Sequence, residues 1–306
     1  MGEAHHLSHS ERASLITTAR KALDDNGFSD VPLIAGTGIA STRETLELTA
    51  EAAKAGADFA LVLASGYFAG VLAGNRQALK GFWKEVSEKS PIPVMIYNYP
   101  GASGGIDLDS DLITEIATEC PNICGVKLTQ VLSRLSHSSD LLIAAHRCGN
   151  VGKLTRIANA VADPNFTSQY PRKNPQAPFL VLGGFIDFLT PSAYANGHGA
   201  ITGLANVAPY TIKELFRVTE AATKDLSHLP EAQRLQGIVA RGDYTIAKAS
   251  IAGTKYLVEK LYGYGGLPRR PLPPIEASAA QALWEHPHTQ DLVRLERELS
   301  GKVKPL

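Results

Sequence analysis

Residues 92–129, IPVMIYNYPGASGGIDLDSDLITEIATECPNICGVKLT, contain two short apolar runs separated by a stretch with helical spacing. Each run is rich in Val, Ile or Met and is flanked by Pro, Gly or Asn. A strand, a helix and a second strand in this order are typical of a parallel sheet whose strands are buried on both faces. The stretch therefore predicts an α/β fold.

The same alternation continues along the chain on both sides of this stretch. The predicted strands are residues 31–36, 58–64, 92–98, 123–129, 179–183 and 200–204. A first helix is expected over residues 10–25, and Ser41 followed by Glu44 is a capping-box pattern that predicts a helix start after the first strand. From about residue 205 the strands stop, which predicts a barrel or a doubly wound sheet followed by helices.

Composition and charge exclude several classes of protein. With 306 residues, of which 44% are hydrophobic, the chain can bury a sizeable core and is not a disordered protein. The 30 Lys and Arg balance the 30 Asp and Glu, so no basic field favours nucleic acid as a partner. Three cysteines indicate a reducing compartment, and no apolar stretch resembles a signal peptide or a membrane helix. We expect a cytoplasmic protein without a membrane partner.

Two residues at strand ends carry the candidate chemistry. Lys127 ends one apolar run, and Tyr97 ends the run before it, so both should emerge at the carboxyl edge of the sheet, where such folds build active sites. Partial burial would lower the pKa of the Lys127 amine and allow it to attack a carbonyl, with the phenol as a proton shuttle. Each residue alone also fits an ordinary role, as a solvated lysine or as a tyrosine bonded to a carbonyl.

Two other patterns do not fit a nucleotide-binding loop or a zinc site. Residues 36–41, GTGIAS, lack the third glycine and the following acidic residue of a dinucleotide loop. His5, His6 and His9 have no cysteine or carboxylate partners at zinc-ligand spacing. We therefore expect neither a metal nor an organic cofactor.

Five motifs in order resemble the dihydrodipicolinate synthase and N-acetylneuraminate lyase family of pyruvate-dependent class I aldolases. The motifs are AGTGIASTRETLEL at 35–48, ASGYF at 64–68, YNYPGASGG at 97–105, GVKLT at 125–129 and GHGAITGLANV at 197–207. The run IAGTKYLVEKLYGYGGLPRRPL, residues 251–272, is most similar to eukaryotic branches that cleave 2-keto-3-deoxy sugar acids or 4-hydroxy-2-oxoglutarate.

The resemblance implies a (β/α)₈ TIM barrel with C-terminal helices, in which Lys127 forms the Schiff base and Tyr97 relays protons. Further substrate contacts implied by the resemblance are Tyr67, Ile201, Gly184, Ala102 and Ser103. We expect a barrel over residues 1–210 and a helical region over residues 211–306. The family also implies a homodimer or homotetramer that acts on a small 2-oxo acid with no cofactor beyond the lysine imine.

The implied reaction is cleavage of a 2-keto-3-deoxy sugar acid, such as L-threo-3-deoxy-hexulosonate, to pyruvate and an aldehyde. The alternatives are a 4-hydroxy-2-oxoglutarate aldolase and a condensation like that of dihydrodipicolinate synthase. Ala102 stands where synthases use an arginine for a second carboxylate, which disfavours that condensation. An alternative of another class is a catalytically inactive or regulatory barrel.

Two further departures from the family pattern concern whole segments. Gly2 and Glu3 are all that remains of the G-[ST]-x-G-E turn, so the barrel is expected to lack its first βαβ unit, through a gene-model error or in a short paralogue. Residues 130–147 interrupt the family pattern after the Schiff-base strand and could be a lid or a translated intron.

Overall fold

The computed structural model describes residues 2–38, 41–129 and 150–301. The chain divides into two compact units, Gly2–Leu182 and Gly183–Leu306, which are described separately below. The predicted division at residue 210, between a barrel and a helical region, stays a prediction. The predicted insertion at residues 130–147 lies outside the described residues.

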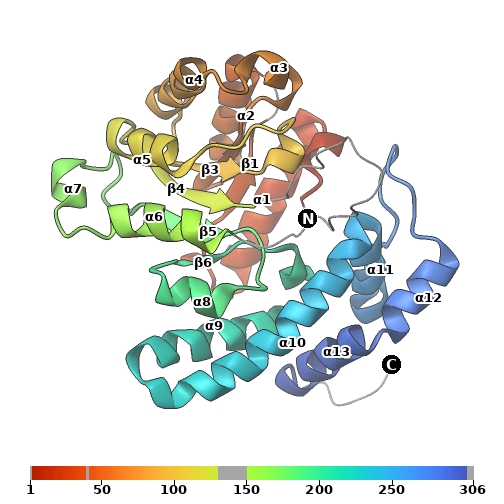
Figure 1. Cartoon of the computed structure of the whole chain (residues 1–306). Helices are drawn as coiled ribbons and strands as arrows, with labels where there is room; N and C mark the ends of the chain where they lie inside the picture. The colour runs from red at the N-terminus through yellow and green to blue at the C-terminus, as the bar shows by residue number, and fades with distance from the viewer. Residues whose placement is uncertain (1, 39–40, 130–149, 302–306) are drawn as a thin grey trace, which may run out of the picture. The chain divides into compact units, whose positions relative to one another are not determined.

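The first unit alternates strands with helices, coloured from red to green in Figure 1. Its strands are β1 (Ile34–Gly36), β2 (Phe59–Leu63), β3 (Val94–Asn98), β4 (Ile123–Leu128) and β5 (Leu180–Gly183), the last of which ends at the unit boundary. Its helices are α1 (His9–Asp25), α2 (Thr42–Ala55), α3 (Ala69–Leu72), α4 (Arg76–Lys89), α5 (Ser110–Glu119), α6 (Val151–Val161) and α7 (Phe166–Gln169).

In the described ranges, six strands form one sheet in the order β1-β2-β3-β4-β5-β6, where β6 is Gly199–Ala200. The pairs from β1 to β4 are parallel. Helices α1, α2, α4, α5 and α6 pack each against the next in chain order. A doubly wound sheet reverses its strand order at a switch point, whereas a (β/α) barrel keeps the order of the chain. The strand order is therefore that of the predicted barrel fold.

Local sequence signals explain the first boundaries. Ser8 and Glu11 form a reciprocal capping box that starts α1, and the Ser41 side chain accepts a hydrogen bond from Glu44 N at the start of α2. Strand β1 begins later than predicted because Leu33 N is held by the Asp58 carboxylate, at 2.7 Å, before the ladder starts.

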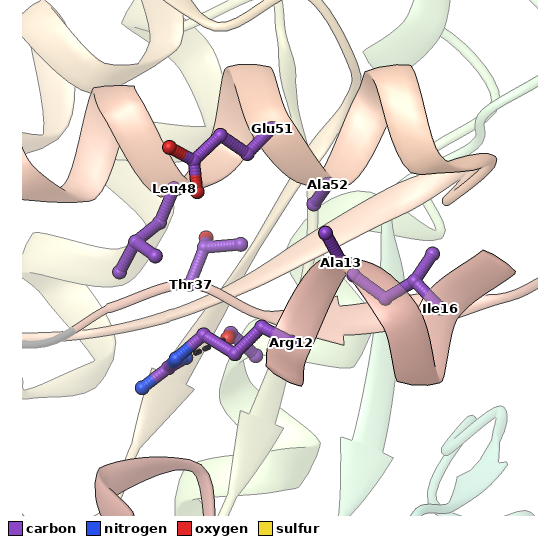
Figure 2. A pocket seen from close by; sticks show the side chains of 8 residues that line it. Arg12, Ala13, Ile16, Thr37, Leu48, Glu51 and Ala52 are labelled. Atoms are coloured by element: carbon purple, nitrogen blue, oxygen red, sulfur yellow. Dashed lines mark hydrogen bonds between the residues drawn. The ribbon is translucent and has the colours of Figure 1, made fainter. Parts of the chain in front are cut away.

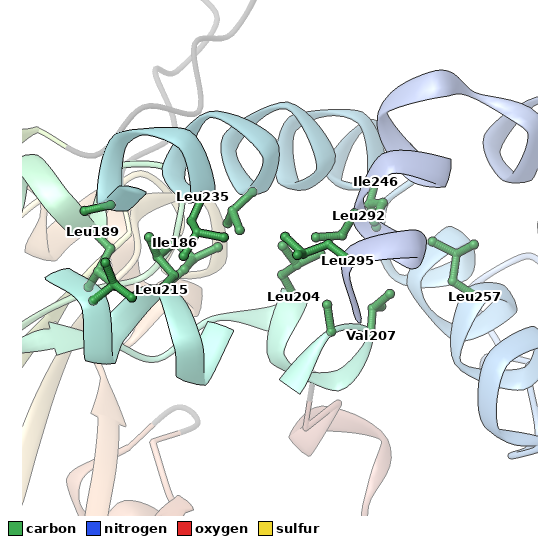
Figure 3. Packing of buried hydrophobic residues seen from close by; sticks show 14 of the residues in the cluster. Ile186, Leu189, Leu204, Val207, Leu215, Leu235, Ile246, Leu257, Leu292 and Leu295 are labelled. Carbon is green, nitrogen blue, oxygen red and sulfur yellow. The ribbon is translucent and has the colours of Figure 1, made fainter. Parts of the chain in front are cut away.

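The second unit is helical apart from β6 and the end of β5. Its helices are α8 (Leu189–Tyr194), α9 (Pro209–Lys224), α10 (Leu229–Lys248), α11 (Ser250–Tyr262), α12 (Ala277–Glu285) and α13 (Pro287–Leu299). Leucines and isoleucines from these helices form one buried cluster, of which Figure 3 shows Leu215, Leu235, Leu257 and Leu292. Burial of this cluster holds the helices of this unit together.

The last predicted strand is shorter than expected. The prediction of a strand over residues 200–204 is wrong after Ala200, because Thr202 caps a 3₁₀ turn at Gly203–Asn206 by accepting a hydrogen bond from Leu204 N. Ile201 N still donates to Gly183 O, at 2.9 Å. In the described part of the chain, no helix is long and apolar enough to cross a membrane.

Candidate active site

Lys127 lies on β4, the most completely buried strand of the first unit. All six residues of β4 are buried, and Lys127 is 9% exposed. Gly125, two residues earlier, lets β5 approach, since a Cβ there would lie 2.4 Å from Leu180 O. The strand thus places an amine in a closely packed sheet rather than in solvent.

An irregularity in the ladder decides which residue faces Lys127. Val94 pairs with Ile123, but Met95 pairs with Gly125, so β4 contains one extra residue, Cys124. This shift pairs Tyr97 with Lys127 rather than with the residue before it. Because side chains alternate between the faces of a sheet, the shift places the phenol and the amine on the same face.

The amine and the aromatic ring are in direct contact. Lys127 Nζ lies 4.1 Å from the centroid of the Tyr97 ring. Among the described residues, Nζ forms no hydrogen bond and no ion pair that would hold it in the charged form. The structure therefore brings together the two residues predicted to carry the chemistry.

Burial changes the protonation of both groups. It lowers the pKa of the Lys127 amine to about 8, because the charged form loses its hydration. Burial also raises the pKa of the Tyr97 phenol to about 12, an effect that the nearby Thr129 hydroxyl opposes. At neutral pH the site holds a neutral phenol and an amine of which about one in ten is uncharged.

Thr129 is a site residue that the sequence reasoning missed. Its side chain is buried, and Oγ1 forms no hydrogen bond of regular geometry among the described residues. The hydroxyl lies close enough to the Tyr97 phenol to lower its pKa through a hydrogen bond, so Thr129 belongs to the same group of side chains as Tyr97 and Lys127. The sequence did contain a signal for this residue, because Thr129 lies two positions after Lys127, directly after the end of β4.

The loop after β3 carries two predicted substrate contacts. Ala102 is exposed, at the end of a 3₁₀ turn, and Ser103 is buried. The Ser103 hydroxyl lies 2.8 Å from Tyr99 O and 3.1 Å from Ile106 O, so it serves as a donor within the loop. Contact of Ala102 and Ser103 with a substrate stays a prediction.

Tyr67 lies away from the buried amine. Its side chain is 86% exposed and packs edge-on against Phe68, at 5.1 Å between ring centroids. Its neighbour Gly66 lies against the loop after β3, because a Cβ there would be 2.9 Å from Ser103. A substrate contact by the exposed ring stays a prediction.

The second unit holds the two remaining predicted contacts. Gly184 is buried directly after β5, and Ile201 is half-buried directly after β6. Asp187, which the sequence reasoning did not single out, is a nearby half-buried residue whose buried Oδ1 atom has no hydrogen-bond partner in the described ranges. Burial raises its pKa to about 6. Substrate contacts by Gly184 and Ile201 stay predictions.

A small pocket at the end of β1 has a structural role. Figure 2 shows Arg12 below Thr37, with its guanidinium bonded to the backbone of the strand end. Arg12 donates to Gly36 O at 3.0 Å, to Leu7 O at 3.3 Å and to Ala4 O. Carbonyl oxygens thus compensate this buried cation, and the pocket contains none of the predicted site residues.

Residues 2–38, 41–129 and 150–301 contain no group of three His, Cys, Asp or Glu side chains placed to hold a metal ion. His9 lies instead between Glu44 and Glu51, with Nε2 2.9 Å from Glu44 and Nδ1 2.8 Å from Glu51. The histidine therefore joins α1 to α2.

Comparisons with known proteins identify relatives of the chain. The model of the dihydrodipicolinate synthetase family matches residues 1–143. The chain is 38% identical to an L-threo-3-deoxy-hexylosonate aldolase of Aspergillus niger, covering 97% of this chain and 84% of that protein. It is also 38% identical to a protein of Emericella nidulans named as a mitochondrial 4-hydroxy-2-oxoglutarate aldolase, covering 98% of this chain and 84% of that one.

A solved structure is also similar to this chain. A dihydrodipicolinate synthase family protein from Coccidioides immitis superimposes with a TM-score of 0.74 at 33% identity, over 97% of this chain and 82% of that one. The fold and the family predicted from the motifs are confirmed. The chain belongs to the dihydrodipicolinate synthetase family.

Proposed function

We propose that this chain is a Schiff-base aldolase that cleaves a 2-keto-3-deoxy sugar acid, such as L-threo-3-deoxy-hexulosonate, to pyruvate and an aldehyde. The predicted enzyme class, a carbon–carbon lyase of the aldolase type, agrees with the names of relatives that are 37–38% identical. The observation that carries the proposal is the buried Lys127 amine, 4.1 Å from the Tyr97 ring centroid.

The nucleophile is the uncharged form of Lys127. Burial lowers its pKa to about 8, so about one amine in ten is uncharged at pH 7, against about one in three thousand at the ordinary value of 10.5. The lone pair attacks the C2 carbonyl of the substrate, and loss of water from the carbinolamine gives an iminium ion. Formation of the iminium therefore becomes faster as the pH rises toward 8.

The iminium accepts the electrons of the bond that breaks. Removal of the C4 hydroxyl proton allows C3–C4 cleavage, the aldehyde leaves, and the electron pair remains as an enamine. Protonation of the enamine at C3 and addition of water release pyruvate and regenerate the amine. No electron sink beyond the lysine imine is required, so the proposal includes no metal and no organic cofactor.

Tyr97 relays protons as a neutral phenol. Its pKa of about 12 prevents it from acting as a standing base near neutral pH, but its hydroxyl can accept one proton while it donates another. The register of β3 and β4 places this residue directly opposite Lys127. Such a relay assists the loss of water from the carbinolamine.

A second candidate is cleavage of 4-hydroxy-2-oxoglutarate, which is the activity named for the Emericella nidulans relative. That substrate has a second carboxylate, which favours a cationic partner. Ala102 offers none in the loop after β3, so we rank this reaction and a dihydrodipicolinate-type condensation below sugar-acid cleavage. Steady-state kinetics with both 2-oxo acids rank the two cleavage reactions.

Borohydride trapping with pyruvate tests the proposal. Reduction of the iminium should add one pyruvate-derived mass to the peptide that contains Lys127, and no other lysine should be modified. Folded protein that gives no adduct would favour the alternative of a catalytically inactive or regulatory barrel.

We also propose that the chain forms a homodimer or homotetramer and is located in the cytoplasm. A homodimer or homotetramer would cover the exposed Tyr67 ring, and light scattering after size-exclusion chromatography measures the assembly. The proposed cytoplasmic location competes with the mitochondrial one in the name of the Emericella nidulans relative, and imaging of a C-terminally tagged full-length protein distinguishes them.

A further inference from the structure

The residue after Tyr97 fastens the loop that follows β3. Asn98 is 3% exposed, and its Nδ2 donates to Asp107 Oδ1 at 2.7 Å. Its Oδ1 accepts a hydrogen bond from Leu108 N at 2.9 Å. The loop at residues 99–108 therefore leaves the strand and is tied back to the residue at which the strand ends.

A lysine from another element binds the same two residues of the loop. Lys153, in the first turn of α6, donates from Nζ to Asp107 Oδ1 at 2.6 Å and to Leu108 O at 3.0 Å. The Lys153 side chain is 7% exposed, and a buried ammonium costs several kcal/mol unless it is paired. The Asp107 carboxylate and the Leu108 carbonyl compensate that cost.

The loop held in this way carries an aromatic ring that packs on the site. The ring centroids of Tyr99 and Tyr97 are 5.5 Å apart, with an angle of 31° between the ring planes. The backbone of Tyr97 is fixed by the sheet, but its side chain is oriented by its neighbours. Contacts thus run from Lys153 through Asp107 to Asn98, the residue that lies in the chain between the two packed rings of Tyr97 and Tyr99.

We propose that Lys153 is a positioning residue, which acts through Asp107 and the loop at residues 99–108 to hold the Tyr97 ring against the Lys127 amine. The inference rests on the proposed function, since it assigns a role in the same site. Lys153 is buried while the Asp107 side chain is 38% exposed, so the buried ammonium has this carboxylate and the Leu108 carbonyl as its compensating partners, and both lie on the loop at residues 99–108. A misplacement of about 1 Å in an active site can cost about a hundredfold in rate.

The test compares the rate of borohydride-trapped imine formation in wild-type protein and in Lys153→Met, with pyruvate, over a pH range centred on about 8. We expect the variant to react about 10- to 100-fold more slowly. The midpoint of its pH dependence should rise, because a displaced ring leaves the Lys127 amine better hydrated. A role limited to stability would leave that midpoint unchanged.

Matched variants separate positioning from general damage. Arg156→Met removes another cation from the same helix, whose Nε donates to Ser110 Oγ at 2.8 Å, and should leave the rate and the midpoint unchanged. Lys153→Arg keeps a cation for Asp107, so its trapping rate and its pH midpoint should lie between those of Lys153→Met and the wild-type protein. If Lys153→Met does not fold, Asp107→Asn replaces it in the test. This variant removes the carboxylate charge but keeps a hydrogen-bond acceptor, and the pH midpoint of imine trapping should rise in the same way.

The outcomes are distinguishable. Wild-type protein without an adduct at Lys127 would overturn the proposed function and this inference together. Normal trapping by wild-type protein, with the same rate and midpoint in Lys153→Met, would overturn the inference alone. The inference would also be overturned if imine trapping were equally slow in Lys153→Met and Arg156→Met and the midpoint of the pH dependence were unchanged in both.

Discussion

The two units differ in the sign of their buried charges and in how those charges are satisfied. The buried charged residues in the described part of the first unit are the cations Arg12, Lys127, Lys153 and Arg172. The buried charged residues in the described part of the second unit are Asp243 and Glu296, whose carboxylates accept hydrogen bonds from backbone N–H groups.

Among the four cations of the first unit, Lys127 differs from the rest. Arg12 and Arg172 donate to backbone carbonyls, and Lys153 donates to Asp107 and a carbonyl. Lys127 contacts an aromatic ring and forms no hydrogen bond with the described residues. A compensated charge fixes structure, whereas an uncompensated one loses its proton more readily and can react.

The second unit illustrates the structural use of buried charge. Glu296 on α13 accepts hydrogen bonds from Tyr210 N at 3.1 Å and Thr211 N at 2.7 Å, at the start of α9. A carboxylate is favourable beside the unpaired N–H groups of a helix start. The buried charges of this unit therefore join helices around the leucine cluster.

The strongest test of the comparison is Lys127→Met. We expect complete loss of the borohydride adduct, because the nucleophile is removed, with the midpoint of urea unfolding unchanged or raised, since a costly buried amine is removed as well. Mass spectrometry and circular dichroism measure the two effects. Lys89→Met, at an exposed lysine paired with Glu85, should keep the adduct. An adduct elsewhere in Lys127→Met would contradict the assignment.

Tyr97→Phe separates the ring from its hydroxyl. The ring still packs on Lys127, so stability should change little, but loss of the proton relay should lower kcat about 100- to 1000-fold. Stopped-flow or coupled assays of pyruvate release measure it. The control is Tyr170→Phe, whose ring packs on Phe166. An unchanged kcat in Tyr97→Phe would exclude the relay.

Leu215→Ala perturbs the other unit. Leu215 is fully buried in the cluster of Figure 3, and its truncation should lower the free energy of unfolding by about 2–5 kcal/mol. Urea titration measures the loss, while trapping at Lys127 in the folded fraction should continue. Leu226→Ala, at a leucine that is 67% exposed, should cost little. Equal losses of unfolding free energy in Leu215→Ala and Leu226→Ala would contradict the role of the buried cluster.

Thr129→Val tests the buried hydroxyl that lies beside the Tyr97 phenol. Replacing the hydroxyl with a methyl group should change stability little, because the hydroxyl forms no hydrogen bond of regular geometry with the described residues. Loss of its interaction with the proton-relaying phenol should lower kcat/KM about tenfold. Thr129→Ser should retain most activity. A parallel fall in stability and activity would show that the hydroxyl is structural.

The smallest effect concerns His9, which joins α1 to α2. Hydrogen bonds with Glu51 and Glu44 raise its pKa above the ordinary value of 6.5. The histidine therefore contributes stability that is fully present below pH 6.5 and is lost as the pH rises through its higher folded-state pKa. The midpoint of urea unfolding, measured against pH, should fall as this stability is lost. His9→Gln should remove this pH dependence, and His228→Gln should keep it. An unchanged slope in His9→Gln would contradict the role.

Much of this protein could be predicted from local pattern. Apolar runs between Gly, Pro and Asn located the strands, with an error at residues 200–204 where Thr202 caps a turn. The strand ends also identified Lys127 and Tyr97. Thr129 and Asp187 were missed because a hydroxyl or carboxyl is informative only when its burial and its lack of a partner are known.

The sequence by itself determined where the strands lie along the chain, the family, and the presence of an amine and a phenol at successive strand ends, because periodicity and motif spacing can be read directly along the chain. The tertiary structure decided that the two groups meet. One extra residue in β4, at Cys124, moves Tyr97 into register with Lys127, and a shift of one residue would turn one of them to the other face. Burial of Lys127, which lowers its pKa, likewise depends on packing against strands distant in sequence.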